Sequence, residues 1–463
     1  MTKWLPRPDQ DARPRYLALA NAIAADIGAG RLLFSAKLPT QRELAHALGL
    51  SVHTVSSAYA ELERRGLIAG EVGRGTYVTF RSDHGEPRFI LGRREKEIID
   101  LSILRPAIGA IHSDRIAAAL AEIAGSGDHA AMLACRPISG FDSHRVAGAH
   151  WLNLHGHDVA PEQVMIVNGC AHGILVALAT LTKPGDIVAT EALTDHGLIA
   201  LASVLHFRLR EIDFDTDGLR PDAFERACRQ GSVKVLVVTP NYSNPTATLM
   251  PEDRRRQIAE IAQRYDVTIV EDDVFLPLLP EQMPPLAAFD RKRACYITSL
   301  TKSLVSGLRV GYLVAPEMMM PRLETRLRAS SWMATPLVSE IAARWIMDGT
   351  ARLLADWQRE ELAARGAILR EHLADHLYCA PPGAPHAFLD LPPAWRPANF
   401  ATHARLAGVA VTPAEPFVVG ENPEPQAIRV TLGAATSRRQ LSTGLERLAT
   451  LFAEEPEPAY INV

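Results

Sequence analysis

Hydrophobic residues near the start of the chain recur with the period of a helix. Between residues 15 and 29 the apolar positions that share one face are Leu19, Ile23 and Ile27. Thr40 and Glu43 then stand at the spacing of a capping box, in which the two side chains satisfy free N–H groups at a helix start. The pattern predicts one helix over residues 15–29 and a second from Thr40 to Gly49.

A third helix and a hairpin complete this first segment. Ser51 is a favoured N-cap residue, and the apolar face that follows it continues to Gly66, where the helix should end. Residues 67–78 have the pattern of a β-hairpin with Arg74, flanked by glycines, at its tip. Two short helices joined by a Gly-Leu turn and followed by a hairpin are typical of a winged helix-turn-helix. In such a module the second helix enters the major groove of DNA and the wing reaches the minor groove.

Short β-branched segments alternate with helical segments in most of the remaining chain. Residues 81–97 come first; they are mostly charged, show little periodicity, and are interpreted as a linker. The expected strands are 163–167, 186–190, 233–239, 267–270, 296–298 and 309–315. Helices are expected between several of them, for example over residues 173–181 and 253–265. The alternation predicts an α/β fold with a mostly parallel sheet. We therefore expect a winged helix-turn-helix domain over residues 1–80, the linker, and a large α/β domain over residues 98–463.

Composition limits the class of protein. The 463 residues are too many for one ordinary core, and 47% hydrophobic with 22% charged residues is typical of a soluble globular protein. The net charge is −4, so any DNA-binding surface must be local. Five cysteines without a C-x-x-C pair argue against a disulfide framework or a structural metal, and fit a reducing cytosol. No apolar segment approaches the ~20 residues of a membrane helix, so we expect a cytoplasmic protein with no membrane partner.

Polar motifs follow four of the expected strands. In a parallel sheet ligands bind at the carboxyl ends of the strands, so motifs at these positions are the most informative. Gly169, Cys170 and Ala171 open a helix, whose first N–H groups can bind a phosphate. Asn244 lies in an Asn-Pro turn after another strand, and its amide can donate a hydrogen bond to a phenolate oxygen. Each of these two motifs, taken alone, also fits an ordinary turn.

The other two motifs supply an amine and its partners. Asp272 follows a β-branched strand, and its carboxylate can pair with a protonated pyridine nitrogen. An acidic strand end also suits a metal, but no neighbouring histidine supports that interpretation. Lys302 can form an imine with an aldehyde, and Ser299, Thr301 and Arg309 around it can hold a phosphate. Together these are the requirements of pyridoxal phosphate.

Residues 15–79 resemble the GntR family of winged-helix transcription regulators in their capping box, Ser-capped helix and Gly-Arg-Gly-Thr wing. The resemblance implies that a DNA operator is a partner of the protein. The residues implied to face DNA are Arg42, Ser51, His53, Thr54, Ser57, Gly73, Arg74 and Gly75. Val52 and Ser57 stand where the family often has basic residues, so the operator sequence is not implied.

Residues 98–455 resemble fold-type I pyridoxal-phosphate enzymes of the aminotransferase superfamily in the order and spacing of their motifs. The resemblance implies that Lys302 forms the Schiff base with the cofactor and that Asp272 pairs with its ring nitrogen. Arg429, in a C-terminal strand, is implied to bind the carboxylate of an amino compound. The other implied cofactor-binding residues are Gly169, Cys170, Ala171, Asn244, Phe275, Ser299, Thr301 and Arg309.

A GntR-type module joined to an aminotransferase-like domain is the arrangement of the MocR branch of GntR regulators. This resemblance implies a homodimer that binds pyridoxal phosphate and a DNA operator. It also implies an effector, a small amine or amino acid, that replaces Lys302 on the cofactor and forms an external aldimine. The effector and the DNA would then bias the same conformational equilibrium.

Several positions depart from the pattern of the enzymes. Phe275 stands where a tyrosine commonly supports the ring hydroxyl, and a phenyl ring cannot donate a hydrogen bond. Asp195 stands where an aromatic residue usually stacks on the ring, and His196 or His172 are alternatives for that contact. Cys135 stands where relatives often have a tyrosine. These departures favour a sensor over an active aminotransferase with an accessory DNA-binding domain; a scaffold that only dimerises is the third hypothesis.

Overall fold

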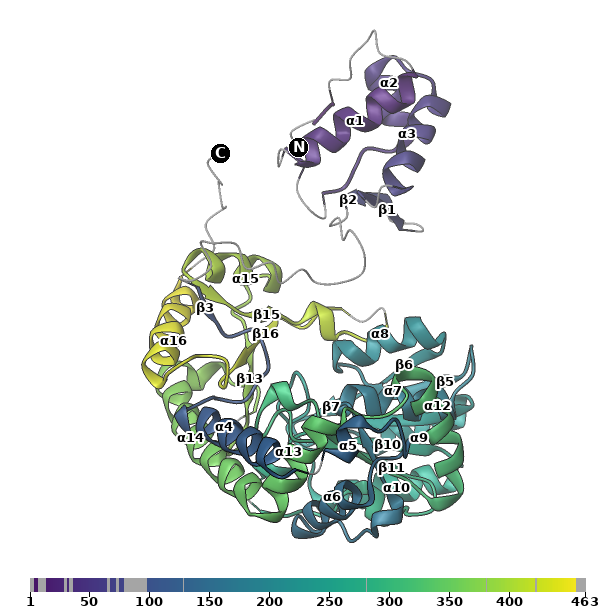
Figure 1. The fold of residues 1–463 in the computed structure, drawn as a ribbon. Coiled ribbons are helices and arrows are strands. Elements are labelled where there is room, and N and C mark those ends of the chain that lie inside the picture. The colour runs from purple at the N-terminus through teal and green to yellow at the C-terminus, as the bar shows by residue number, and fades with distance from the viewer. Residues whose placement is uncertain are drawn as a thin grey trace. The chain divides into compact units, whose positions relative to one another are not determined.

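The computed structural model describes residues 4–6, 14–28, 31–32, 36–64, 67–71, 75–78, 98–127, 129–279, 281–379, 381–420 and 423–454. The chain divides into two compact units, Met1–Glu95 and Lys96–Val463. Figure 1 draws the first unit in purple and the second in colours from blue to yellow. The predicted linker, residues 81–97, lies outside the described residues.

The first unit contains the three helices and the hairpin that the hydrophobic pattern predicts. Its elements are α1 (Arg15–Gly28), α2 (Gln41–Leu48), α3 (Val52–Arg64), β1 (Ile68–Glu71) and β2 (Gly75–Val78). The strands pair in antiparallel register, with Ile68 opposite Val78. Buried apolar side chains from the three helices and β1 form its core, among them Leu19, Ile23, Leu44, Val55, Leu62 and Ile68.

Side-chain caps define where the second and third helices begin. Thr40 Oγ1 accepts a hydrogen bond from the Glu43 N–H at 3.3 Å, and Glu43 Oε2 accepts one from the Thr40 N–H at 2.8 Å. This is the predicted capping box. Gly49 ends α2 with a φ of 65°, a conformation that favours glycine. Ser51 Oγ accepts the Thr54 N–H at 3.1 Å and caps α3, as the sequence predicts.

The second unit is built on a seven-stranded sheet in the order β4-β12-β11-β10-β9-β5-β6. Its strands are β4 (Val164–Val167), β5 (Ile187–Glu191), β6 (Arg208–Ile212), β9 (Val233–Val238), β10 (Thr268–Asp272), β11 (Cys295–Ser299) and β12 (Gly311–Val314). The strands from β11 to β6 run parallel, and β12 is antiparallel to both its neighbours. The predicted mostly parallel sheet is confirmed. Nearly continuous burial along the inner strands β9 and β11 fits a sheet covered on both faces.

Two strand boundaries differ from the prediction and move functional side chains. Glu271 and Asp272 belong to β10, because they pair with Tyr296 and Ile297 of β11; the predicted strand ended at residue 270. Arg309 was expected to begin a strand, but its φ of 50° is left-handed. That conformation interrupts an extended chain, so β12 begins only at Gly311.

Smaller sheets and helices complete the second unit, and in Figure 1 α15 and α16 lie beside the small sheets rather than beside the seven-stranded one. The remaining strands are β13 (His386–Asp390), β16 (Ala427–Thr431) and β15 (Thr412–Pro413) in one sheet, β3 (Ile99–Asp100) with β14 (Val409–Ala410), and β7 (Phe214–Asp215) with β8 (Gly218–Leu219). The helices are α4 (Ala110–Gly125), α5 (Ala130–Leu133), α6 (Asp142–Leu154), α7 (Cys170–Leu181), α8 (His196–Leu205), α9 (Pro221–Gln230), α10 (Glu252–Arg264), α11 (Leu286–Phe289), α12 (Met320–Ser331), α13 (Pro336–Met347), α14 (Thr350–Leu373), α15 (Pro397–Leu406) and α16 (Arg438–Ala453).

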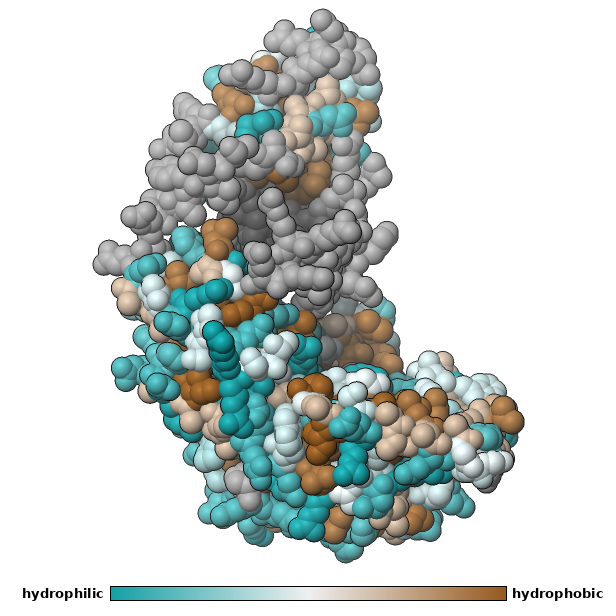
Figure 2. Space-filling model, turned by 60° about the vertical axis from the view of Figure 1, so that its left-hand side comes forward, coloured by the Kyte–Doolittle hydropathy of each residue, from teal (hydrophilic) through white to brown (hydrophobic). Residues whose placement is uncertain are grey.

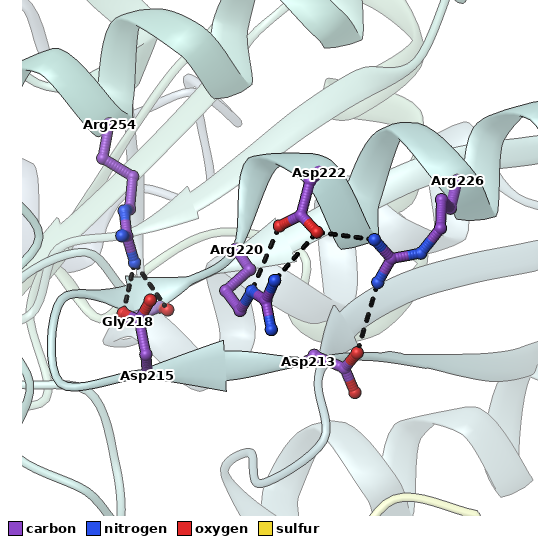
Figure 3. A network of polar contacts seen from close by, with 7 residues as sticks. All are labelled: Asp213, Asp215, Gly218, Arg220, Asp222, Arg226 and Arg254. Carbon is purple, nitrogen blue, oxygen red and sulfur yellow. Dashed lines mark hydrogen bonds and ion pairs between the residues drawn. The ribbon is translucent and has the colours of Figure 1, made fainter.

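A network of ion pairs fixes the β7–β8 hairpin to the neighbouring helices. Figure 3 shows its members: Asp213, Asp215, Gly218, Arg220, Asp222, Arg226 and Arg254. Arg254, from α10, pairs with Asp215 and donates to the Gly218 carbonyl oxygen at 3.2 Å. Asp222, in the first turn of α9, accepts hydrogen bonds from Arg220 and from Arg226, and Arg226 also pairs with Asp213. Exposed pairs of this kind contribute about 0–1 kcal/mol each, so the network orients the hairpin more than it stabilises the fold.

The surface of the protein is mixed in polarity. Figure 2 shows hydrophobic residues interspersed with hydrophilic ones on the face it draws. None of the helices in the described part of the chain is long and apolar enough to span a membrane. All five cysteines are free thiols.

Candidate functional site

Lys302 lies in the turn that follows β11. Its Nζ donates a hydrogen bond to the Leu104 carbonyl oxygen at 2.5 Å. Burial lowers the pKa of the Lys302 amine. The charge of Asp195 opposes this change, whereas the charges of Arg429 and Arg309 add to it. An amine whose pKa is lowered is more often free of its proton and is a better nucleophile.

Asp272, the last residue of β10, has a carboxylate oxygen without a partner. Its Oδ1 is buried and has no hydrogen bond to any described residue. Burial raises the pKa of this carboxyl to about 7, the nearby charge of Asp195 adds to the effect, and a hydrogen bond from Cys170 opposes it. A buried acceptor without a donor is costly, so the site suits a ligand that brings a positively charged N–H group.

A glycine and two side chains converge at the start of α7. Gly169 has a φ of 81°, and a Cβ at this position would lie 3.3 Å from Arg309 Nη2 and 3.6 Å from Thr301 Cγ2. The Ser299 and Thr301 hydroxyl oxygens are 2.7 Å apart beside it. The first N–H groups of α7, from Cys170 onward, join this cluster at a helix N-terminus. Hydroxyls, a guanidinium and a helix start together form a suitable cradle for a phosphate.

Asn244 joins two charged groups that are far apart in the sequence. Its Oδ1 accepts a hydrogen bond from Arg429 Nη1 at 2.8 Å, and its Nδ2 donates to Asp195 Oδ2 at 2.7 Å. Arg429 Nη2 donates to the Ser102 carbonyl oxygen at 2.6 Å, and the guanidinium lies 4.8 Å from the ring centre of Phe417. Burial lowers the pKa of Arg429 to about 10. The structure therefore brings Asn244 and Arg429, both expected from the sequence, into direct contact.

The site also contains residues that the sequence did not identify as binding residues. Asp195 was noted only for the aromatic residue it replaces, yet it contacts Asn244 and caps α8 through the Gly197 N–H at 2.7 Å. His386 is buried on β13, and its Nε2 lies 3.0 Å from the Ser243 carbonyl oxygen. Because a carbonyl oxygen only accepts, this nitrogen carries the proton. Neither residue belongs to a sequence motif, so the sequence gave no signal that Asp195 or His386 lies in the site.

His386 is adjacent to Phe275, the residue that replaces a tyrosine. The two ring centres are 6.0 Å apart, and Phe275 is fully buried. Burial lowers the pKa of His386 to about 3, and the charges of Arg429 and Lys302 add to this effect. His386 is therefore neutral at physiological pH.

The two histidines considered for the stacking contact lie in different places. His172 is hydrogen-bonded through Nδ1 to the Asn168 N–H and through Nε2 to Ser330, which ties it to α12. His196 lies beside Asp195, with its Nδ1 4.0 Å from Asp195 Oδ2. Cys135 is exposed, and its carbonyl oxygen accepts a hydrogen bond from Trp332 Nε1 at 2.7 Å.

Three consecutive carbonyl groups connect the site to the start of the second unit. The Ser102 oxygen accepts from Arg429, the Ile103 oxygen from Thr431 Oγ1 at 3.1 Å, and the Leu104 oxygen from Lys302. This segment follows β3, which is the first described element after residue 97. Residues 102–104, near the start of the second unit, therefore hydrogen-bond to both Lys302 and Arg429.

The residues expected to face DNA lie on the first unit. Arg42 is exposed in the first turn of α2, and Ser51 and His53 are exposed at the start of α3. The Ser51 and Thr54 hydroxyl oxygens are 2.8 Å apart, and Ser57 is half-buried one turn later. Gly75 pairs with Glu71 in the hairpin, whereas Gly73 and Arg74 lie outside the described residues. In the described ranges, no group of three or more His, Cys, Asp or Glu side chains is arranged to hold a metal ion.

Comparisons with known proteins agree with this division of the chain. Residues 96–448 match the aminotransferase class I and II family, and residues 15–78 match the gntR family of bacterial regulatory proteins. The chain has the fold of a Pyrococcus horikoshii kynurenine aminotransferase, with a TM-score of 0.72 and 23% identity over 78% of this chain and 92% of that one.

Two similar proteins are named as transcription regulators or regulatory proteins. The chain is 29% identical to the uncharacterized HTH-type transcriptional regulator YdeF of Bacillus subtilis (strain 168), over 97% of this chain and 96% of that protein. It is 26% identical to the probable rhizopine catabolism regulatory protein MocR of Rhizobium meliloti, over 80% of each. The chain therefore belongs to the aminotransferase class I and II family and, with its GntR helix-turn-helix, is a transcription regulator of the GntR/MocR type.

Proposed function

We propose that the protein binds pyridoxal phosphate, detects a small amino compound at Lys302, and changes its DNA binding in response. The observation that carries the proposal is the convergence of four side chains from distant parts of the sequence: Lys302, Asp272, Asn244 and Arg429. An amine, a buried carboxylate, an amide and a guanidinium in one site meet the needs of a pyridine aldehyde and of an amino-acid ligand.

The residues fit the cofactor. The unpartnered Asp272 Oδ1 would accept the ring N–H, and Asn244 would donate to the ring hydroxyl. Arg309, Thr301 and the first N–H groups of α7 would hold the phosphate in the space beside Gly169. When bound, pyridoxal phosphate supplies an aldehyde carbon at which one amine can replace another.

The response to the effector is supported by the carbonyl groups of residues 102–104. Lys302 Nζ donates to the Leu104 oxygen as a free amine; bound pyridoxal phosphate would engage this nitrogen, and an effector amine that took its place would free it again. Arg429 loses or shares its bond to the Ser102 oxygen when it takes up a carboxylate. Both changes alter the hydrogen bonds of the segment that leads to the helix-turn-helix. Effector and DNA are thereby coupled, and each changes the affinity for the other.

A sensor is favoured over an enzyme by the groups around the ring. Phe275 offers no hydroxyl where turnover chemistry commonly has one, and its neighbour His386 is neutral and bonded to a backbone carbonyl. Asp195 places a carboxylate where an aromatic side chain would hold the ring. Retention of the cofactor with slow or absent transamination is the expected outcome.

We also propose that the protein is a homodimer, which would present two helix-turn-helix modules to a two-part operator. Support comes from large apolar side chains that are exposed on α13 and on the three helices that pack against it, α4, α5 and α6. These side chains are Leu120, Leu133, Val146, Leu337 and Met347. A second copy is a suitable cover for such a surface. Sedimentation equilibrium should give twice the mass of one chain.

Absorption spectroscopy tests the function. Purified protein supplied with pyridoxal phosphate should show a visible band that the Lys302→Ala variant lacks, whereas Lys292→Ala, which removes an exposed lysine, should keep it. Candidate amines should shift the band without sustained release of keto acid. Absence of the band in the wild-type protein would refute cofactor binding, and continued keto-acid production would show an active aminotransferase.

A further inference from the structure

Asn244 hydrogen-bonds to two charged side chains, Asp195 and Arg429, which differ in their access to solvent. The Asp195 side chain is 46% exposed, whereas Arg429 is 4% exposed. The Arg429 Nη atoms already donate to Asn244 Oδ1 and to the Ser102 carbonyl oxygen. A ligand that approaches this part of the site therefore meets the carboxylate first, and the guanidinium is already engaged.

Asp195 is held in place but is not saturated. Its Oδ1 accepts the Gly197 N–H at 2.7 Å, because the residue caps α8, and its Oδ2 accepts Asn244 Nδ2 at 2.7 Å. Each carboxylate oxygen has two lone pairs, so both oxygens can accept a further donor. The exposed His196 lies 4.0 Å from Asp195 Oδ2, and the carboxylate also interacts electrostatically with the buried Lys302 and Arg429.

The side-chain amide of Asn244 lies between the positive charge of Arg429 and the negative charge of Asp195. Its acceptor oxygen faces Arg429 and its donor nitrogen faces Asp195, so the amide links a cation to an anion. An added carboxylate placed beside Asp195 would be repelled by it. An added ammonium group would be attracted, and it would also bring the hydrogen-bond donors that the free lone pairs of Asp195 can accept.

We propose that Asp195 is the ammonium-binding residue of the effector site, and that the effector is a diamine or a dibasic amino acid. One amine of the effector would take the place of the Lys302 amine on the aldehyde carbon of bound pyridoxal phosphate, which would release Lys302 as a free amine, and the second, as an ammonium ion, would pair with Asp195. This inference rests on the function proposed above, since it assigns a chemical class to the effector of that same site. It also gives a reason for a carboxylate at a position where an aromatic residue would otherwise be expected.

The test compares pairs of ligands that differ by one amine. Putrescine is matched with butylamine and ornithine with norvaline, and each is titrated into the cofactor-loaded protein while the visible band is followed. The diamine of each pair should half-saturate at a concentration about tenfold lower than its partner, the size expected for a partly exposed charge-assisted hydrogen bond. Added salt should reduce this preference, because it screens an exposed charge pair.

Variants at Asp195 connect the preference to this side chain. Asp195→Asn and Asp195→Ser remove the charge and retain a favoured N-cap for α8, so that the fold is preserved in at least one of them. In both variants the ratio between the paired ligands should approach one. Asp158→Asn, which neutralises a carboxylate that is 86% exposed on another surface, should leave the ratio unchanged.

The outcomes separate this inference from the function on which it rests. A band shift by monoamines at the same or lower concentration than by their diamine partners would overturn the inference and leave the sensor intact. An unchanged ratio in folded Asp195 variants would overturn it as well. If none of the four amines shifts the band of the wild-type protein, both the inference and the proposed sensing at Lys302 are wrong.

Discussion

The buried Asp272 carboxyl should lower the free energy of unfolding of the cofactor-free protein, by an amount that depends on pH. Burial, with the charge of Asp195, raises its pKa from 3.8 to about 7. Between these values the folded protein holds a proton that the unfolded chain has lost. Stability therefore falls as the pH rises from about 4 to about 7, and it stays at the lower level above that range. Replacement by asparagine removes this pH-dependent loss.

The magnitude follows from the two pKa values. A difference of about 3 corresponds to ~4 kcal/mol at pH 8. The asparagine amide, however, inherits a site in which Oδ1 has no donor, and an unsatisfied buried amide costs about 1–3 kcal/mol. We therefore expect cofactor-free Asp272→Asn to be about 1–3 kcal/mol more stable than wild type at pH 8, with no such gain near pH 4. Its affinity for pyridoxal phosphate should fall by about tenfold to a hundredfold, because a charge-assisted hydrogen bond is lost.

Urea unfolding of the cofactor-free protein at pH 8 and near pH 4, followed by tryptophan emission, measures the first effect. Trp4 is the only one of the six tryptophans outside residues 96–463, so the signal reports mainly the second unit. Asp158→Asn is the control, since its carboxylate is 86% exposed and should leave stability unchanged at both pH values. A destabilised Asp272→Asn at pH 8, or unchanged cofactor affinity, would refute the reasoning.

Three further substitutions test other parts of the account. Thr40→Ala removes the capping box and should cost the first unit about 1 kcal/mol, seen as faster amide exchange in residues 41–48; unchanged exchange would count against the cap. Arg42→Ala should weaken DNA binding about tenfold and lower the salt dependence by about one ion, whereas an unchanged salt slope would remove Arg42 from the phosphate contacts. Thr431→Val breaks the bond to the Ile103 oxygen and should reduce the effect of effector on DNA affinity while the visible band persists; an undiminished effect would exclude the segment 102–104 from the coupling.

The local elements of both units could be predicted from the sequence because their signals are local. The capping box of α2 and the Ser51 cap of α3 occupy neighbouring residues, and the apolar strands of the large sheet are short continuous runs. Lys302 and Asp272 were identifiable because each follows or ends a strand whose carboxyl end borders the site. The strand boundary at Arg309 was wrong because a left-handed φ at a non-glycine residue has no clear signature in the sequence.

The contacts that determine the chemistry of the site could not be predicted. Asn244 contacts Asp195 across 49 residues and Arg429 across 185, and Lys302 reaches the Leu104 oxygen across 198. No pattern within a helix or strand encodes such pairs; they depend on how the sheets pack. From the sequence, Asp195 was notable only because it replaces the aromatic residue that usually stacks on the cofactor ring. The structure shows that it contacts the side-chain amide of Asn244, which also accepts a hydrogen bond from Arg429.

The most direct test of the account is whether the chemical state of Lys302 controls DNA binding. A DNA duplex selected by the protein from a random pool is titrated with cofactor-loaded protein, with and without the amine that shifts the visible band at the lowest concentration. We predict a change in DNA affinity of about fivefold or more in wild type and in Lys292→Ala, and none in Lys302→Ala. An equal change in Lys302→Ala, or no change in wild type once the band shift is complete, would contradict the account.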